Sequence, residues 1–98
     1  MIKNLVEIIR KNKKKDIKKS YTSFLINNGL EGCVAKMEEE FAELIEAINE
    51  NKNQVHEAAD LIYHLLVTLE AANIKFEDVL DELKKRTNQS GLNEKKNR

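Results

Sequence analysis

Apolar residues recur every three or four positions along most of the chain, which is the spacing of one face of an amphipathic helix. This spacing predicts five helices, over residues 2–14, 21–27, 33–51, 54–72 and 76–86. Ser20 is a favourable N-cap for the second helix, Gly29 is expected to end it in a left-handed conformation, and Asn73 ends the fourth. No segment sustains the two-residue alternation of a strand. The pattern therefore predicts an all-α bundle of four or five helices joined by short loops.

The helix expected over residues 33–51 has an acidic flank beside its apolar stripe. At helical spacing, Glu39, Glu40 and Glu43 lie together on this flank, at separations of three and four residues. Like charges this close repel one another and destabilise an isolated helix. Water at the surface or a cation in a cleft could offset the repulsion. The stripe consists of apolar residues at helical spacing: Val34, Met37, Phe41, Leu44, Ile45 and Ile48.

The helix expected over residues 54–72 is apolar around nearly its whole circumference, which is typical of a buried helix. Its polar side chains form one narrow strip: Glu57, Asp60, His64 and Thr68. Burying an unpaired carboxylate costs several kcal/mol or shifts its pKa until it is neutral. The two carboxylates of the strip therefore need a partner.

A short turn over residues 49–53 favours antiparallel packing of these two helices, which would bring the acidic flank to the polar strip. Carboxylates gathered around one cleft suit a hard cation, and Mg²⁺ in particular shares its shell with waters and substrate phosphates. Such a site would activate a water molecule and hydrolyse a phosphoanhydride. The spacing is equally compatible with acidic side chains that face solvent and with a Glu57 that pairs with a lysine.

The composition supports a small helical domain. The 98 residues include no Pro and only three Gly, and 41% of them are hydrophobic. We expect one domain over residues 1–87, followed by a polar, basic tail over residues 88–98. A chain of this length buries roughly 60–65% of its unfolded surface, so we expect a homodimer or a higher homo-oligomer.

The charge balance argues against some classes of partner. The 17 basic and 17 acidic residues cancel, so we expect no nucleic acid and no membrane as partner. The balance hides a basic start (residues 1–19, net +6), an acidic centre (residues 38–60, net −7) and a basic end (residues 84–98, net +5). These blocks are compatible with solvated helix faces, or with a cation-binding centre between regions that contact an anionic substrate.

The chain also carries signals of its location. The single cysteine, Cys33, excludes an internal disulfide framework and fits a reducing compartment such as the cytoplasm. No apolar run approaches the length of a membrane span, and the first residues lack the apolar core of a signal peptide. A cytoplasmic location is therefore expected.

Two acidic motifs, Glu39-Glu40-Phe41-Ala42-Glu43 and Glu57-Ala58-Ala59-Asp60, carry a resemblance to a known superfamily. Their spacing resembles that of the MazG-like all-α nucleotide pyrophosphohydrolases. Within that superfamily the chain is more similar to the phosphoribosyl-ATP pyrophosphohydrolases of histidine biosynthesis, through Ser20-Tyr21-Thr22, Tyr63-His64 and Ser90-Gly91-Leu92. Three positions depart from the family pattern: Glu38 stands where Gly is usual, Phe41 stands where Ala is usual, and Ile17 stands near the place where a Pro is common.

The resemblance implies a specific reaction and a set of metal ligands. It implies that a cytoplasmic homodimer hydrolyses phosphoribosyl-ATP to phosphoribosyl-AMP and pyrophosphate. It also implies Mg²⁺ ligands at four positions, which are Glu40, Glu43, Glu57 and Asp60. Glu39 would be an additional ligand or would orient a water molecule.

Basic residues outside the acidic motifs are candidates for binding substrate phosphates: Lys36, Arg86, Lys95 and Arg98. Arg86 could equally be a charge favoured by the dipole at a helix C-terminus, and Lys95 and Arg98 could belong to a disordered tail. His64 is a further substrate-binding candidate, which lies one helical turn from Asp60 and could orient that carboxylate or be an ordinary core histidine. Cys33 has no base near it in the sequence and is not expected to be a nucleophile.

Two other functions remain open from the residues alone. A house-cleaning pyrophosphatase of the same fold would hydrolyse common nucleoside triphosphates and leave phosphoribosyl-ATP untouched. A non-enzymatic helical interaction module would tolerate Glu57→Gln or Asp60→Asn, whereas either change should abolish the activity of a metal-dependent hydrolase.

Overall fold

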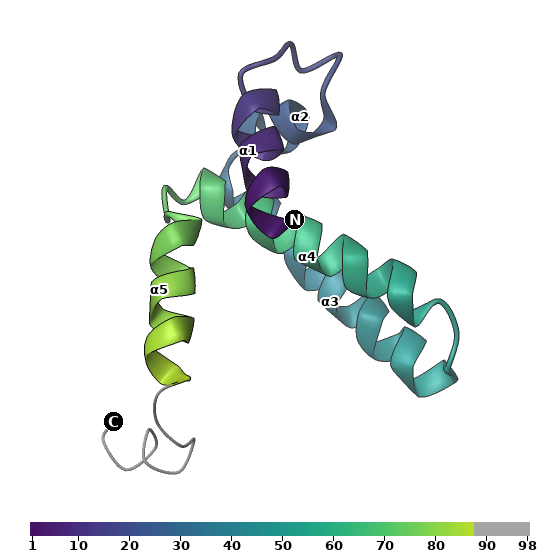
Figure 1. The fold of residues 1–98 in the computed structure, drawn as a ribbon. Helices are drawn as coiled ribbons and strands as arrows, with labels where there is room; N and C mark the ends of the chain where they lie inside the picture. The colour runs from purple at the N-terminus through teal and green to yellow at the C-terminus, as the bar shows by residue number, and fades with distance from the viewer. Residues whose placement is uncertain (88–98) are drawn as a thin grey trace.

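The computed structural model describes residues 1–87, which fold into five helices (Figure 1). In chain order these are α1 (Ile2–Asn12), α2 (Tyr21–Asn27), α3 (Leu30–Glu50), α4 (Gln54–Ala71) and α5 (Phe76–Arg86). Residues 1–87 contain no strand, so the all-α fold class is confirmed. The basic tail expected over residues 88–98 lies outside the described residues.

Most helix boundaries agree with the sequence pattern, and the differences have local causes. The Ser20 side chain caps α2 by accepting a hydrogen bond from the Ser23 amide at 3.1 Å. Gly29 has a positive φ of 95°, but its ψ of 161° is extended rather than left-handed as expected. The chain enters α3 directly after Gly29, so this glycine redirects the backbone between two helices, and α3 begins earlier than the sequence predicts.

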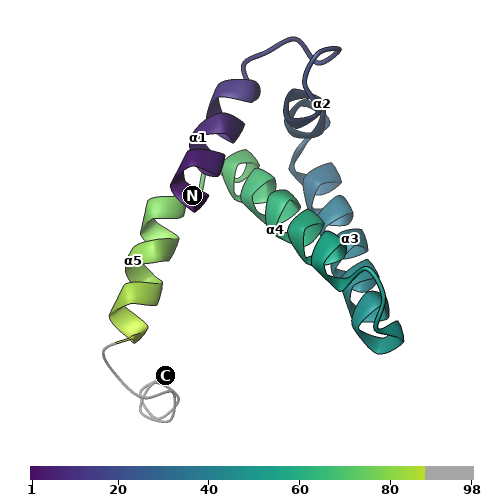
Figure 2. The same ribbon diagram turned by 45° about the vertical axis from the view of Figure 1, so that its right-hand side comes forward.

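Helices α3 and α4 form a long hairpin, and both views show them side by side (Figures 1 and 2). The connecting turn contains Asn51 and Asn53, which both adopt the left-handed conformation that asparagine tolerates. At the other end of the hairpin, the Thr68 hydroxyl donates a hydrogen bond to the Cys33 carbonyl at 3.3 Å. The short turn thus gives the antiparallel packing that the sequence favours, with the start of α4 beside the second half of α3.

The core lies at the end of the hairpin farthest from the turn, where α1 and α2 cover α4. Its fully buried apolar members are Val6, Ile9, Leu25, Cys33, Leu66 and Val67. The Thr22 and Tyr63 hydroxyls share a hydrogen bond of 2.5 Å that joins α2 to α4. This packing fixes the relative position of α3 and α4 without using the acidic half of the hairpin.

The sequence predicts that α4 is buried almost all round, and for the single chain this is wrong. Ile62 and Leu65 of α4 are exposed, as are Phe41, Ile45 and Ile48 of α3. A groove of about 570 Å³ between the two helices is lined by their apolar side chains, together with Glu38. No other element of residues 1–87 packs over this face, which is why it stays exposed. We call these five exposed residues the apolar face of the hairpin. Within the described part of the chain, no helix is long and apolar enough to span a membrane.

Helix α5 turns away from the hairpin at Asn73, which has a positive φ of 60° (Figures 1 and 2). No α5 residue is buried, but Phe76 at its start packs against the core, and Arg10 of α1 forms an ion pair with Glu77. The Arg10 guanidinium donates to both Glu77 oxygens at 2.9 and 2.7 Å and to Glu70 of α4 at 3.3 Å. Lys13 donates a further hydrogen bond to Glu70. One arginine therefore links α1 to both α4 and α5.

This ion-pair group shifts the ionisation of its carboxyls. The bidentate contact with Arg10 lowers the pKa of Glu77 to about 2. Burial disfavours the charged form of Glu70, but the hydrogen bonds and charges of Lys13 and Arg10 outweigh burial and lower its pKa below the ordinary 4.5. Both carboxylates are therefore ionised in the folded protein over a wider pH range than in the unfolded chain.

The contacts of Glu70 predict a pH-dependent contribution to stability. Since its folded pKa is lowered, the contribution is present above pH 4.5 and is lost as the pH falls through the folded value. We expect Glu70→Gln to lower the free energy of unfolding by about 1–2 kcal/mol at neutral pH, and by less in acid. Urea unfolding at both pH values measures this, with Glu7→Gln on the exposed side of α1 as the control. An equal loss at both pH values would contradict the prediction.

Candidate active site

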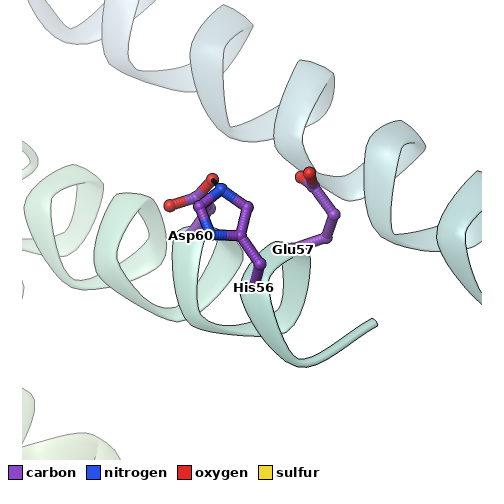
Figure 3. Close-up of side chains that lie close together, drawn as sticks. All are labelled: His56, Glu57 and Asp60. Carbon is purple, nitrogen blue, oxygen red and sulfur yellow. Dashed lines mark ion pairs between the residues drawn. The ribbon is translucent and has the colours of Figure 1, made fainter. Parts of the chain in front are cut away.

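Three carboxylates converge between α3 and α4. Glu40, Glu43 and Glu57 each offer one oxygen, and these atoms all lie within 4.8 Å of one another. Glu40 and Glu43 are one helical turn apart on α3, and Glu57 stands in the first turn of α4. Figure 3 shows the Glu57 side chain pointing from α4 toward the neighbouring helix. The antiparallel hairpin therefore joins the two acidic motifs into one group.

Two oxygens of this group are buried without a partner. Glu40 is only 6% exposed, and the Oε2 atoms of Glu40 and Glu57 accept no hydrogen bond from any group in the described residues. Burial, followed by the closeness of Glu43, raises the pKa of both carboxyls above the ordinary value. Buried, unsatisfied carboxylate oxygens are costly unless a proton or a cation joins them.

The donor set fits a hard divalent cation. Carboxylate oxygens are the ligands that Mg²⁺ and similar ions take, and three of them from two helices can share one ion. The unpartnered Oε2 atoms of Glu40 and Glu57 are free to bind such an ion without breaking an existing hydrogen bond. The residues present at this site therefore fit a divalent metal.

The positive charge of Lys36 offsets the negative charge of the acidic group on one side only. Its ammonium lies 3.3 Å from Oε1 of Glu39 and 3.6 Å from Oε1 of Glu40. The hydrogen bond to Glu39 raises the pKa of Lys36, so the lysine stays charged. Among residues 1–87, no lysine forms an ion pair with Glu57, so the alternative in which Glu57 pairs with a lysine is not what the structure shows.

Glu39 and Asp60 lie at the edge of the three-carboxylate group. The Glu39 side chain is 56% exposed and pairs with Lys36, so the structure does not bring it to the convergent oxygens. Asp60 forms a second group with His56 and Glu57, again with ligand atoms within 4.8 Å of one another (Figure 3). Its charge contributes to the raised pKa of Glu40 and of Glu57. Asp60 therefore joins the site through Glu57.

His56 is a site residue that the sequence reasoning missed. Its Nε2 lies 3.3 Å from Oδ2 of Asp60. The signal was present in the sequence, because residues four apart on a helix are neighbours.

His64 is buried beside Glu40 rather than bonded to Asp60. Its Nε2 lies 3.8 Å from Oε1 of Glu40, and no hydrogen bond joins it to Asp60 within the described residues. Tyr21 and Tyr63 meet the imidazole ring edge to face. His64 lies deeper between the helices than Asp60, which is why its carboxylate neighbour is on α3. Burial, followed by the charge of Lys36, lowers the pKa of His64 and favours the neutral imidazole.

The remaining predicted residues lie away from the acidic group. Arg86 pairs with Glu82 on α5, and α5 diverges from the hairpin in both views (Figures 1 and 2). The structure therefore does not bring Arg86 to the acidic group within one chain. Lys95 and Arg98 fall outside the described residues. Cys33 is buried, and burial raises the pKa of its thiol, which makes it a poor nucleophile.

Comparison with known proteins agrees with the motifs. The family described as phosphoribosyl-ATP pyrophosphohydrolase matches residues 2–87. A phosphoribosyl-ATP pyrophosphatase of Allorhizobium ampelinum is 44% identical over 81% of this chain and 78% of its own length. A protein of the same name from Rhizobium etli is 40% identical over 97% of this chain and 91% of its own length. Another, from Vesicomyosocius okutanii, is 41% identical over 96% of this chain and 91% of its own.

The family match includes both acidic motifs, the Ser20 cap and the Tyr63-His64 pair, all of which lie within residues 2–87. It therefore spans the whole part of the chain that builds the site described above. The resemblance expected from the sequence is confirmed, and the chain belongs to the phosphoribosyl-ATP pyrophosphohydrolase family.

Proposed function

We propose that this protein hydrolyses phosphoribosyl-ATP to phosphoribosyl-AMP and pyrophosphate, the second step of histidine biosynthesis, in a reaction that depends on Mg²⁺. Membership of the family and the names of the relatives support the substrate and the bond that is broken. The observation that carries the metal dependence is the pair of buried, unpartnered Oε2 atoms of Glu40 and Glu57. The proposed location is the cytoplasm, in keeping with a single cysteine that is unpaired.

Each acidic residue has a role that follows from its position. Glu40, Glu43 and Glu57 hold the ion between the helices, and Asp60 extends the ligand set on the side of His56. When bound, Mg²⁺ supplies positive charge that offsets the charge of a triphosphate and makes a water molecule more acidic. The long α3–α4 hairpin keeps the carboxylates from separating, because its far end is fixed by the core. Glu39 orients Lys36 rather than the ion.

The contacts around Glu40 support a role for some of the predicted substrate-binding residues and not for others. Lys36 lies beside Glu40 and is partly exposed, so its positive charge would be available to a phosphate group of the substrate. His64 packs against Glu40 and keeps that carboxylate facing the acidic group. That substrate phosphates contact Arg86, Lys95 and Arg98 stays a prediction from the sequence.

Two copies of the chain are proposed to pair through the apolar face of the hairpin. Phe41 and Ile48 are 54% and 58% exposed, and the groove beside them is almost entirely apolar. Contiguous apolar surface of this kind is usually covered in soluble proteins. Two hairpins that pack face to face would form a four-helix core, which is a stable arrangement for antiparallel helices. The acidic side of each hairpin would stay accessible.

Loss of a metal ligand tests the proposed reaction. We expect Glu57→Gln to lower kcat/KM for phosphoribosyl-ATP at least about 100-fold, because changes in supporting residues alone cost metal sites 10–100-fold. Pyrophosphate release with and without Mg²⁺ measures the effect. Glu31→Gln, exposed at the start of α3, is the control. In metal-free protein Glu57→Gln should not reduce stability, because it relieves repulsion between carboxylates.

Two results would contradict the proposed function. One is a Glu57→Gln variant that keeps the wild-type rate. The other is a wild-type protein that hydrolyses common nucleoside triphosphates and leaves phosphoribosyl-ATP untouched, which is the behaviour of a house-cleaning pyrophosphatase.

The raised pKa values of Glu40 and Glu57 predict the response of metal-free protein to pH. Because the folded pKa lies above 4.5, the stabilisation from their bound protons is complete below pH 4.5 and is lost as the pH rises through the folded values. As the pH rises through these values, we expect the unfolding temperature of the metal-free wild-type protein to fall. The unfolding temperature of metal-free Glu40→Gln should fall less. Mg²⁺ should restore it at neutral pH, since the ion binds the ionised carboxylates of the folded state. An unfolding temperature that is the same with and without Mg²⁺ at neutral pH would contradict the prediction.

A charge on the apolar face tests the proposed dimer. We expect Leu65→Glu to convert a dimer into a monomer of 11.3 kDa, because the new carboxylate would be buried without a partner in the interface. Sedimentation equilibrium measures the mass. Ile17→Glu, an exposed apolar position away from this face, is the control and should leave the dimer intact. A wild-type protein that sediments as a monomer would contradict the prediction.

A further inference from the structure

His56, Glu57 and Asp60 form a group with nitrogen and oxygen donors at the start of α4. One ligand atom from each lies within 4.8 Å of the other two, and Nε2 of His56 is 3.3 Å from Oδ2 of Asp60. Figure 3 shows the imidazole beside the Asp60 carboxylate, with Glu57 on the inner side toward α3. No step of the proposed reaction uses His56.

One divalent ion would leave part of the negative charge of the ionised site without compensation. When ionised, Glu40, Glu43, Glu57 and Asp60 carry four negative charges, and one divalent ion offsets two of them. Lys36 already pairs with Glu39 and reaches Glu40 only at Oε1. A second divalent ion beside Asp60 would balance the remaining charge.

Glu57 connects the two groups of ligands. It belongs both to the all-oxygen group with Glu40 and Glu43 and to the group with His56 and Asp60. Its Oε2 is buried and unpartnered, as is Oε2 of Glu40, a residue more than nine-tenths buried. A carboxylate has two oxygens, so Glu57 can serve an ion on each side. The outer group is open to solvent, since the His56 side chain is 72% exposed and Asp60 41%.

We propose that His56 supplies a nitrogen ligand to a second divalent ion, held with Glu57 and Asp60, and that this ligand favours Mn²⁺ over Mg²⁺ at the outer position. The inference rests on the proposed function, because it assumes that the all-oxygen group holds the first ion. Mg²⁺ and Mn²⁺ both take carboxylate and water ligands, but Mg²⁺ demands a strict octahedral oxygen shell, whereas Mn²⁺, as a transition-metal ion, tolerates a nitrogen ligand beside the oxygens. The two positions would therefore differ in the ion they prefer.

The nitrogen ligand can be detected without measuring activity. The full chain is loaded with Mn²⁺ alone, and pulsed electron paramagnetic resonance records the coupling of the ion to ¹⁴N. The chain has two histidines, so the signal can be assigned by removing each one. We expect the histidine coupling in the wild type and in His64→Asn, and its loss in His56→Asn. Histidine labelled with ¹⁵N should shift the coupling in the wild type, which assigns it even if His64→Asn fails to fold.

Metal affinity gives a second readout. We expect His56→Asn to weaken Mn²⁺ binding at least about tenfold, because loss of a group that only supports the ligands already costs about 10–100-fold, and to leave Mg²⁺ binding nearly unchanged. Asparagine is a matched replacement, because it is polar and close in reach but offers an amide instead of the imidazole. His56 is exposed, so the variant should fold normally.

The outcomes separate this inference from the proposed function. A wild-type protein that binds Mn²⁺ without ¹⁴N coupling, while Mg²⁺-dependent pyrophosphate release is normal, would overturn the role of His56 and leave the reaction intact. Coupling that persists in His56→Asn would overturn it as well. Failure of Glu57→Gln to impair hydrolysis would instead contradict the proposed function.

Discussion

Two buried carboxylate oxygens without partners, Oε2 of Glu40 and Oε2 of Glu57, are the constraint on which the acidic half of the structure depends. Two unconnected helices would avoid the cost of burying these unpartnered oxygens by moving apart. The hairpin prevents that, because its turn at Asn51–Asn53 is tight and its other end is fixed by a core that contains Leu66 and Val67. The core thus offsets the cost of an acidic group that a divalent ion can relieve.

The hairpin carries its converging acidic residues and its exposed apolar residues on two different faces. Glu40 and Glu43 face α4, whereas Phe41 and Ile45 belong to the apolar face. This explains why two departures from the family pattern are compatible with the site. Glu38 and Phe41 both line the apolar groove, away from the convergent oxygens. Their effect therefore falls on the proposed contact between copies and not on the ligands.

The sequence predicted the features that depend on neighbouring residues and missed those that depend on distant ones. Helical spacing located all five helices, and a short turn implied that Glu57 would meet Glu40 and Glu43. The path of α5 could not be predicted, because its contacts join residues far apart in the sequence: Phe76 packs against the core, and Arg10 pairs with Glu77, 67 residues away. The exposure of Leu65 was also missed, since an apolar circumference does not say whether the covering surface belongs to the same chain.

The contacts of Glu40 also bear on how a substrate would meet the metal. Lys36 and His64 both approach Oε1, and Oε2 is left without a partner. An ion at Oε2 therefore displaces neither residue. The ion at Oε2 and the ammonium group of Lys36 near Oε1 would then both be available to substrate phosphates. Because His64 is held by Tyr21 and Tyr63, Glu40 is supported by a neutral ring rather than by a competing charge. Oε2 of Glu40 is thus left open, while the two nearby basic side chains lie on the side of Oε1.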